Sequence, residues 1–91
     1  MAVAVKIPAP DQTSEQVRII RWLKTKGQTV AAGEPVLEVE TDKAVMEVES
    51  FADGILLEVL AEPDDVVKVS RTVAIVGQKG EDISALLEEA S

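Results

Sequence analysis

The segment that decides the fold is Glu38-Val39-Glu40-Thr41-Asp42-Lys43-Ala44-Val45-Met46-Glu47-Val48-Glu49. Apolar residues and glutamates alternate along both of its halves, and such period-two alternation is typical of half-buried strands. The middle, Thr41–Ala44, has the composition of a turn, because an aspartate side chain can hydrogen-bond its own backbone. The segment therefore predicts a β-hairpin with Lys43 at its tip and glutamates on its solvent face.

Short apolar runs separated by turn signals continue on both sides of this hairpin. About eight such runs, with turn signals about every 8–12 residues, predict an all-β sandwich or flattened barrel. Apolar residues on both parities of residues 17–22 predict a strand that is covered on both sides or twisted. Residues 23–36 also align without gaps on residues 60–73, an offset of 37. Two such copies can bury their apolar faces around a pseudo-twofold axis.

Composition excludes several classes of function. The 91 residues carry a formal net charge of −8, which argues against binding to nucleic acid or to anionic membranes. There is no cysteine and no histidine, so disulfides, thiolate chemistry and a serine–histidine triad are excluded. Carboxylates are abundant, but no insertion is evident that would form a cleft for a paired-carboxylate hydrolase. No apolar run is long enough for a membrane span, and the start does not resemble a signal peptide, so an intracellular protein is expected.

The domain is expected to occupy residues 1–79, followed by a tail over residues 80–91. In the tail, Ile83, Leu86, Leu87 and Ala90 recur at helical spacing, and Asp82 is placed to cap a helix. Two glutamates in the last turn oppose the helix dipole. The tail therefore predicts either a short, marginal helix or the start of a linker.

The run from Glu40 to Ala44, followed by Met46-Glu47-Val48, resembles the attachment motif of lipoyl domains. These are the carrier domains of the dihydrolipoamide acyltransferase component of 2-oxo acid dehydrogenase complexes. Ile19, Trp22 and the run Gly33-Glu34-Pro35 are also similar to that family, and the resemblance extends from about Val3 to Val76. It implies two four-stranded antiparallel sheets related by quasi-twofold symmetry.

The resemblance further implies that lipoate is attached to Lys43 by an amide bond, with Asp42 and Ala44 presenting the lysine. The domain would then be a non-catalytic, monomeric swinging-arm carrier, in a pyruvate-type complex before others. Its implied partners are a lipoyl ligase, a thiamin-diphosphate-dependent decarboxylase, the acyltransferase core and dihydrolipoamide dehydrogenase. The expected location is the cytoplasm, or the mitochondrial matrix in a eukaryote.

The chain departs from the family where Val17, Asp64 and Ser70 replace frequent glycines. Those positions should avoid a strongly positive φ or carry strain. Trp22 is expected in the core, and Phe51 is expected to be partial core or a lid on the sheet edge.

Two other functions stay open from the sequence. A biotin carrier shares this architecture, although it usually has methionine on both sides of the lysine, where this chain has Asp42 and Ala44. In a β-sandwich interaction module without a carrier role, Lys43 would be an ordinary solvated charge in a polar turn.

Overall fold

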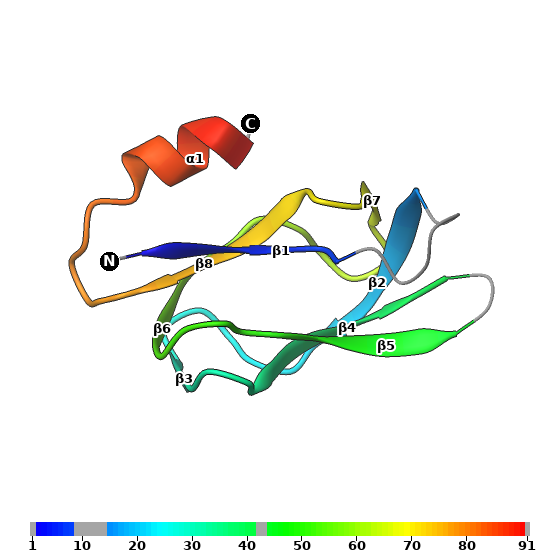
Figure 1. Ribbon diagram of the computed structural model, residues 1–91, viewed down its shortest axis with the longest axis horizontal. Coiled ribbons are helices and arrows are strands. Elements are labelled where there is room, and N and C mark those ends of the chain that lie inside the picture. The colour runs from blue at the N-terminus through cyan, green and yellow to red at the C-terminus, as the bar shows by residue number, and fades with distance from the viewer. Residues whose placement is uncertain (1, 9–14, 42–43, 91) are drawn as a thin grey trace.

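The computed structural model describes residues 2–8, 15–41 and 44–90. Two four-stranded antiparallel sheets stack face to face, with one short helix outside them (Figure 1). The strand orders are β1-β8-β6-β3 and β5-β4-β2-β7. The predicted all-β sandwich of two four-stranded sheets is confirmed. Its elements are β1 (Val3–Lys6), β2 (Gln16–Trp22), β3 (Thr29–Val30), β4 (Pro35–Glu40), β5 (Val45–Glu49), β6 (Gly54–Val59), β7 (Val66–Lys68), β8 (Thr72–Gly77) and α1 (Ser84–Ala90).

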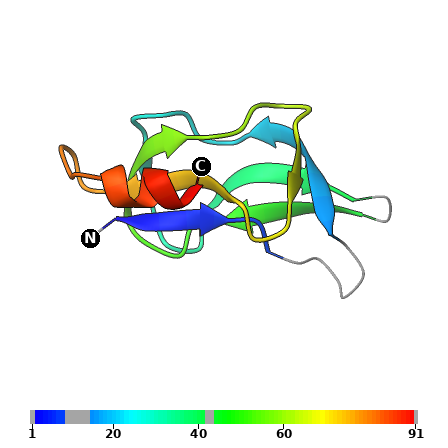
Figure 2. The same cartoon turned by 90° about the horizontal axis from the view of Figure 1, so that it is seen from above.

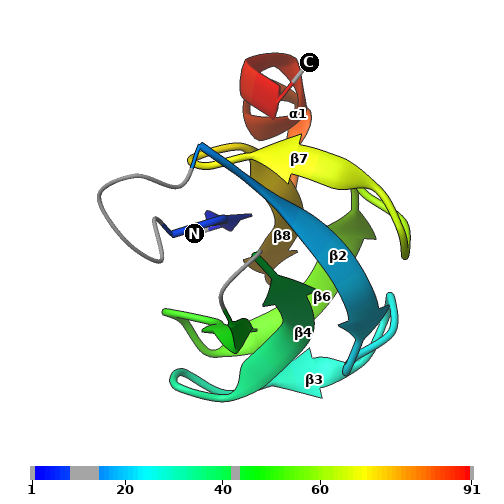
Figure 3. The same ribbon diagram turned by 90° about the vertical axis from the view of Figure 1, so that its right-hand side faces the viewer.

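The core between the two sheets is aliphatic. Seen end-on, strands from both sheets surround it, while α1 lies outside the sandwich (Figure 3). Val39 and Val48 are buried as predicted, whereas Met46 and Trp22 pack against the core and stay partly exposed. Each fully buried Val, Leu or Ile side chain contributes roughly 1.5–3 kcal/mol. The largest are Ile7, Val17, Ile19, Val30, Val36, Leu37, Val39, Leu56, Val73, Ile75 and Val76.

Positions 37 residues apart occupy equivalent places in the two sheets. β3 and β4 correspond in this way to β7 and β8. The backbone N–H of Gly27 donates to the carbonyl of Leu56 over 2.8 Å, and the N–H of Asp64 donates to the carbonyl of Ile19 over 2.7 Å. The two donors, Gly27 and Asp64, are 37 residues apart, and so are the two acceptors, Ile19 and Leu56. The predicted quasi-twofold symmetry is confirmed.

The β-bulges follow the same symmetry. The strand register skips Ile20 in β2 and Leu57 in β6, which are 37 residues apart. It also skips Val36 in β4 and Val73 in β8, again 37 residues apart. A bulge places two residues opposite one and bends the strand, so all four bulges curve the sheets around the core in equivalent places.

The bulge at Ile20 explains why β2 shows apolar residues on both parities. Before the bulge, Val17 and Ile19 face the core; after it, Trp22 faces the core although its parity differs. Arg18 and Arg21 lie on the outer face for the same reason. Of the two predicted explanations, a strand covered on both sides is wrong, because Arg18 and Arg21 are exposed. A bulge increases the local twist of a strand, so the structure agrees with a strand that twists and adds the bulge at Ile20.

The predictions for the two aromatic residues met different outcomes. Trp22 packs against the core, and its indole Nε1 donates to the carbonyl of Ala61 over 3.0 Å. Phe51 is 82% exposed, so the expectation of partial core was wrong. Ser50 takes the buried place because its hydroxyl donates to the carbonyl of Ala52 and accepts from the N–H of the same residue. With Ser50 facing inward, strand alternation turns Phe51 outward.

Two of the three positions where the family often has glycine do adopt a positive φ. Asp64 has a φ of 73° and Ser70 a φ of 74°, while Val17 lies in regular strand. Of the two predicted outcomes, avoidance and strain, the structure has strain at these two residues. Backbone hydrogen bonds hold the conformation. Ser70 donates its N–H to the carbonyl of Ile7, beyond the end of β1, over 2.8 Å, and within the turn Arg71 donates to the carbonyl of Lys68 over 3.1 Å.

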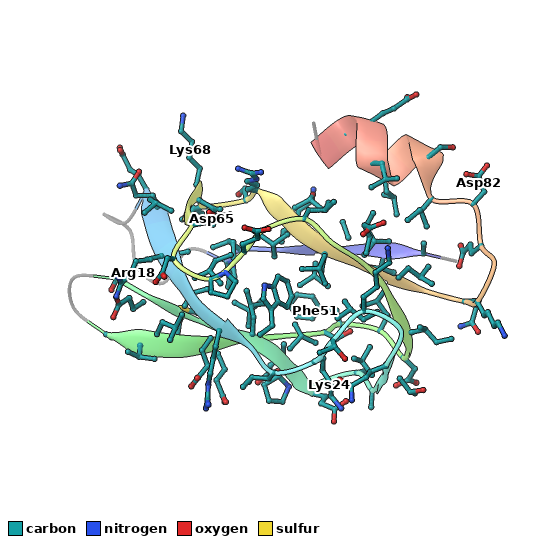
Figure 4. All side chains as sticks on the ribbon, turned by 180° about the vertical axis from the view of Figure 1, so that it is seen from behind. Arg18, Lys24, Phe51, Asp65, Lys68 and Asp82 are labelled. Atoms are coloured by element: carbon teal, nitrogen blue, oxygen red, sulfur yellow. The ribbon has the colours of Figure 1, made fainter. Side chains whose placement is uncertain are left out.

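The tail forms the short helix α1, which packs over β8. Asp82 precedes it (Figure 4), and its carboxylate accepts the backbone N–H and the hydroxyl of Ser84. The predicted capping by Asp82 is confirmed. In the described ranges, no helix has the length and apolar character needed to cross a membrane.

Candidate functional site

The candidate site lies at the end of the β4–β5 hairpin, the two strands that flank the predicted attachment lysine. Their register pairs Leu37 with Val48 and Val39 with Met46 on the inner face, and it pairs Glu38 with Glu47 on the outer face. Leu37, Val39 and Val48 are buried, so both arms are anchored in the core. The predicted hairpin, with apolar residues inside and glutamates outside, is confirmed.

Thr41 and Ala44 close the hairpin. The backbone N–H of Thr41 donates to the carbonyl of Ala44 over 2.8 Å, and the N–H of Ala44 donates to the Thr41 hydroxyl over 3.2 Å. Two residues link this pair, Asp42 and Lys43, and both lie outside the described residues. The third predicted site residue, Ala44, is exposed, as is the following Val45. The two residues that flank Asp42-Lys43 are therefore hydrogen-bonded to each other, and the Ala44 side of this hairpin end is exposed to solvent.

Arginines of β2 neutralise the glutamates of β4 on the outer face. Arg18 forms an ion pair with Glu40, and Arg21 forms one with Glu38, in both cases between directly paired strand positions. Arg18 lies on β2 next to the end of β4 (Figure 4). Exposed ion pairs contribute little stability each, about 0–1 kcal/mol, but two in a row fix the side chains beside the hairpin end.

The described part of the site offers no catalytic apparatus. No group of three or more carboxylates among the described residues is arranged to hold a metal ion, and the sequence has no His or Cys. Lowered pKa values occur at Glu34, Glu81 and Asp82, each because the carboxylate accepts a backbone N–H from a residue two or three positions away. None of these three belongs to the hairpin end.

Sequence reasoning missed two contributors to this site. The hydroxyl of Thr41 accepts the N–H of Ala44, a role that a threonine before a turn aspartate could have suggested. The two arginine–glutamate pairs depend on the β2–β4 register, which the bulge at Ile20 sets. That bulge could not be located from alternation alone.

Comparison with known proteins places most of the chain in one family. The biotin/lipoyl family, described as "Biotin-requiring enzyme", matches residues 3–76. A dihydrolipoyllysine-residue acetyltransferase component of pyruvate dehydrogenase complex from Zymomonas mobilis is 36% identical and covers 100% of this chain. A pyruvate dehydrogenase E1 component subunit beta from Rhizobium meliloti is 38% identical and covers 99% of it. The chain spans about a fifth of each relative, 21% and 20% of their lengths.

A solved structure agrees with this result. The solution structure of the lipoyl domain of the 2-oxoglutarate dehydrogenase complex from Azotobacter vinelandii aligns with a TM-score of 0.64 and 30% sequence identity. The alignment covers 85% of this chain and 100% of that domain. Fold and sequence thus agree over the same part of the molecule, and the chain belongs to the biotin/lipoyl domain family.

Proposed function

We propose that this chain is a lipoyl carrier domain and that Lys43 is its attachment residue. The observation that carries the proposal is the hydrogen-bonded hairpin end, where Thr41 and Ala44 flank the sequence Asp42-Lys43. The chain that carries this hairpin belongs to the biotin/lipoyl domain family. Ala44 and Val45 are exposed, which suits a group that must reach the active sites of other proteins. An amide to lipoate needs only a lysine amine from the carrier.

The residues of this chain act by presentation. Free lysine has a pKa near 10.4, so a ligase must remove a proton from Nζ and supply an activated acyl donor, whose leaving group departs as the amide forms. Thr41, Ala44 and the buried side chains of β4 and β5 fix the two strand ends on either side of the sequence Asp42-Lys43. Positioning of this kind counts for more than intrinsic reactivity. When bound, lipoate would supply the acyl-carrying and redox chemistry, which is intrinsic to the cofactor.

The proposed setting is a pyruvate-type 2-oxo acid dehydrogenase complex in the cytoplasm or mitochondrial matrix. The partners would be a lipoyl ligase, the thiamin-diphosphate-dependent decarboxylase, the acyltransferase core and dihydrolipoamide dehydrogenase. The names of the two relatives support the pyruvate type; one is an acetyltransferase component and the other an E1 subunit. We favour an acyltransferase chain as the parent. Within it, tethering would raise the effective concentration of the carrier at each partner site.

Lipoylation in vitro tests this proposal. The chain would be treated with lipoate and a lipoyl ligase, and intact mass and peptide mapping would locate the product. We expect modification of Lys43 alone, with the formal charge moving from −8 to −9 because a cation becomes a neutral amide. Lys43→Arg should abolish modification and keep the thermal unfolding transition.

Two controls sharpen this test. Thr41→Val removes the hydroxyl that accepts the Ala44 N–H, so it should slow lipoylation and speed hydrogen exchange at Ala44. The swap of Asp42→Lys with Lys43→Asp should not restore lipoylation in place of Lys43, because moving a residue by one turns its side chain to the other face. Lipoate on another lysine, none on Lys43, or biotin attached by a biotin ligase in its place would contradict the proposal.

A further inference from the structure

β5 is the edge strand of its sheet and presents an exposed row of side chains. Among the described strands it pairs only with β4, so the hydrogen-bonding groups on its other side belong to no described ladder. Val45, Glu47 and Glu49 alternate on the outer face, and Phe51 follows at the same spacing just beyond the strand. Val45 is 59% exposed and Phe51 82%. An open edge of this kind is a template for another extended chain.

A shallow groove runs along this edge where the two sheets meet. β1 is the edge strand of the other sheet, and Lys6 and Pro8 at its end face β5 across the groove. The groove holds about 150 Å³. Buried Val48 forms part of its floor, and exposed Phe51 also lines it. It is therefore apolar at the base and charged along the rim.

The charge on this rim is unbalanced. Glu38 and Glu40 of β4 are each paired with an arginine, whereas Glu47 and Glu49 form no ion pair with another described residue. Glu47 also lies directly opposite Glu38, and like charges in that relation are destabilising. Lys6 is the one cation among the groove residues, and it forms no ion pair with Glu47, Glu49 or any other described carboxylate. The edge therefore has two carboxylates to offer to a cationic partner.

We propose that the β5 edge binds an extended basic segment of a partner protein. Alternate residues of two paired strands have the same spacing, so two arginines or lysines at alternate positions would lie opposite Glu47 and Glu49. Apolar side chains one step further out in each direction would cover Val45 and Phe51. A second copy of this chain fits poorly, because pairing β5 with β5 would place glutamates against glutamates on molecules that each carry a charge of −8.

This inference goes beyond the carrier function, because the edge does not depend on modification of Lys43. The probe is a short synthetic peptide with two arginines at alternate positions between two leucines at the same spacing, the intervening residues being serine or threonine. Titrated into the ¹⁵N-labelled 91-residue chain at low salt, it should shift the amide signals of β5 and Lys6. It should also protect outward N–H groups of β5 from exchange. Added salt should weaken binding, because exposed charges are screened.

Matched variants test whether the peptide binds to the β5 edge or is attracted only by the net negative charge of the domain. Glu47→Gln with Glu49→Gln should lower the affinity for the peptide by about tenfold, as should Phe51→Ser. Glu62→Gln with Glu89→Gln, which removes the same charge from exposed positions outside the groove, should leave affinity within about twofold. Unmodified Lys43→Arg should bind as the wild type does, which separates this result from a failure of lipoylation.

Three outcomes would overturn the proposal. The first is equal binding of a peptide of the same composition with adjacent arginines, since only alternate positions match β5. The second is equal loss of affinity in the Glu62/Glu89 control. The third is a concentration-dependent dimer through β5 in the absence of peptide. Melting curves of all variants would verify that each remains folded.

Discussion

Asp64 and Ser70 adopt the positive-φ backbone conformation that glycines adopt at the equivalent positions in the other half of the molecule. Their φ values of 73° and 74° correspond, at the offset of 37 residues, to 97° at Gly27 and 85° at Gly33. The left-handed region costs a residue with a Cβ atom roughly 1–2 kcal/mol. The turn geometry is thus set by the fold, and the second half of the chain adopts it without glycine.

Exchanging residues between these symmetry-related turns tests that account. Ser70→Gly should raise the free energy of unfolding by up to about 1 kcal/mol, because relief of strain outweighs the greater entropy of unfolded glycine. Gly33→Ala should lower it by about 1 kcal/mol, for conformational reasons alone, since a Cβ there would meet nothing within 4 Å. Urea denaturation of both variants measures these changes. Destabilisation by Ser70→Gly would contradict the account.

At the scale of the element, β4 and β5 show what alternation can predict. Their inner and outer faces follow from the sequence because the strand register between Leu37 and Glu40 is regular. The face of Phe51 could not be predicted, because a polar residue, Ser50, occupies the preceding inward position and satisfies its hydroxyl within the turn. The side of Trp22 depended on a bulge for which the sequence carries no clear signal.

The two faces of β5 should respond differently to substitution. Val48 is 2% exposed, so Val48→Asp would bury an unpaired charge, one of the largest costs of a single substitution. We expect that variant to lose its cooperative thermal transition. Glu47→Gln on the exposed face should change the melting temperature little. Calorimetry of the two proteins makes the comparison, and similar melting would show that the faces of β5 are wrongly assigned.

At the scale of the whole molecule, the quasi-twofold symmetry separates the two ends of the domain. The start of β1 and the end of β8 lie at the opposite end from the end of β4 and the start of β5 (Figures 1 and 2). The long dimension of the domain is 38 Å. A linker that joined the domain at the end of β8 would therefore leave from the end opposite to Thr41 and Ala44, whereas α1 folds back over the sandwich.

The same symmetry was visible in the sequence as an offset of 37 residues, which predicted the equivalence of β3–β4 with β7–β8. It could not predict that Asp64 would share the φ of Gly27, because few side chains are identical between the copies. For the site, the hairpin and the turn over Thr41–Ala44 followed from the sequence, but the hydrogen bond from the Ala44 N–H to the Thr41 hydroxyl did not. Lys43 and Asp42 lie outside the described residues, so their roles stay predictions.

Stability of the whole domain should fall in acid through a small set of carboxylates. The pKa of Glu34 is lowered first by the backbone N–H of Ala31, 3.1 Å away, and then by Lys24, with which it forms an ion pair at 3.2 Å. Glu81 and Asp82 are also lowered by backbone N–H donors. A lowered folded pKa means that the unfolded chain binds protons first. Their stabilisation is therefore present above the ordinary carboxyl pKa, about 4, and lost as the pH falls through the folded values.

Glu34→Gln isolates one of these contributions. The amide oxygen can still accept the Ala31 N–H, but the attraction to Lys24 is gone, so the variant should melt below the wild type at about pH 6. The difference in melting temperature should close as the pH falls through the lowered pKa of Glu34, because Glu34 of the wild type is then protonated and equally uncharged. Glu62→Gln, whose parent side chain makes no described ion pair, controls for the change in net charge. A difference in melting temperature between wild type and variant that stays constant or widens in acid would show that Glu34 stabilises the fold through its shape and not through its charge.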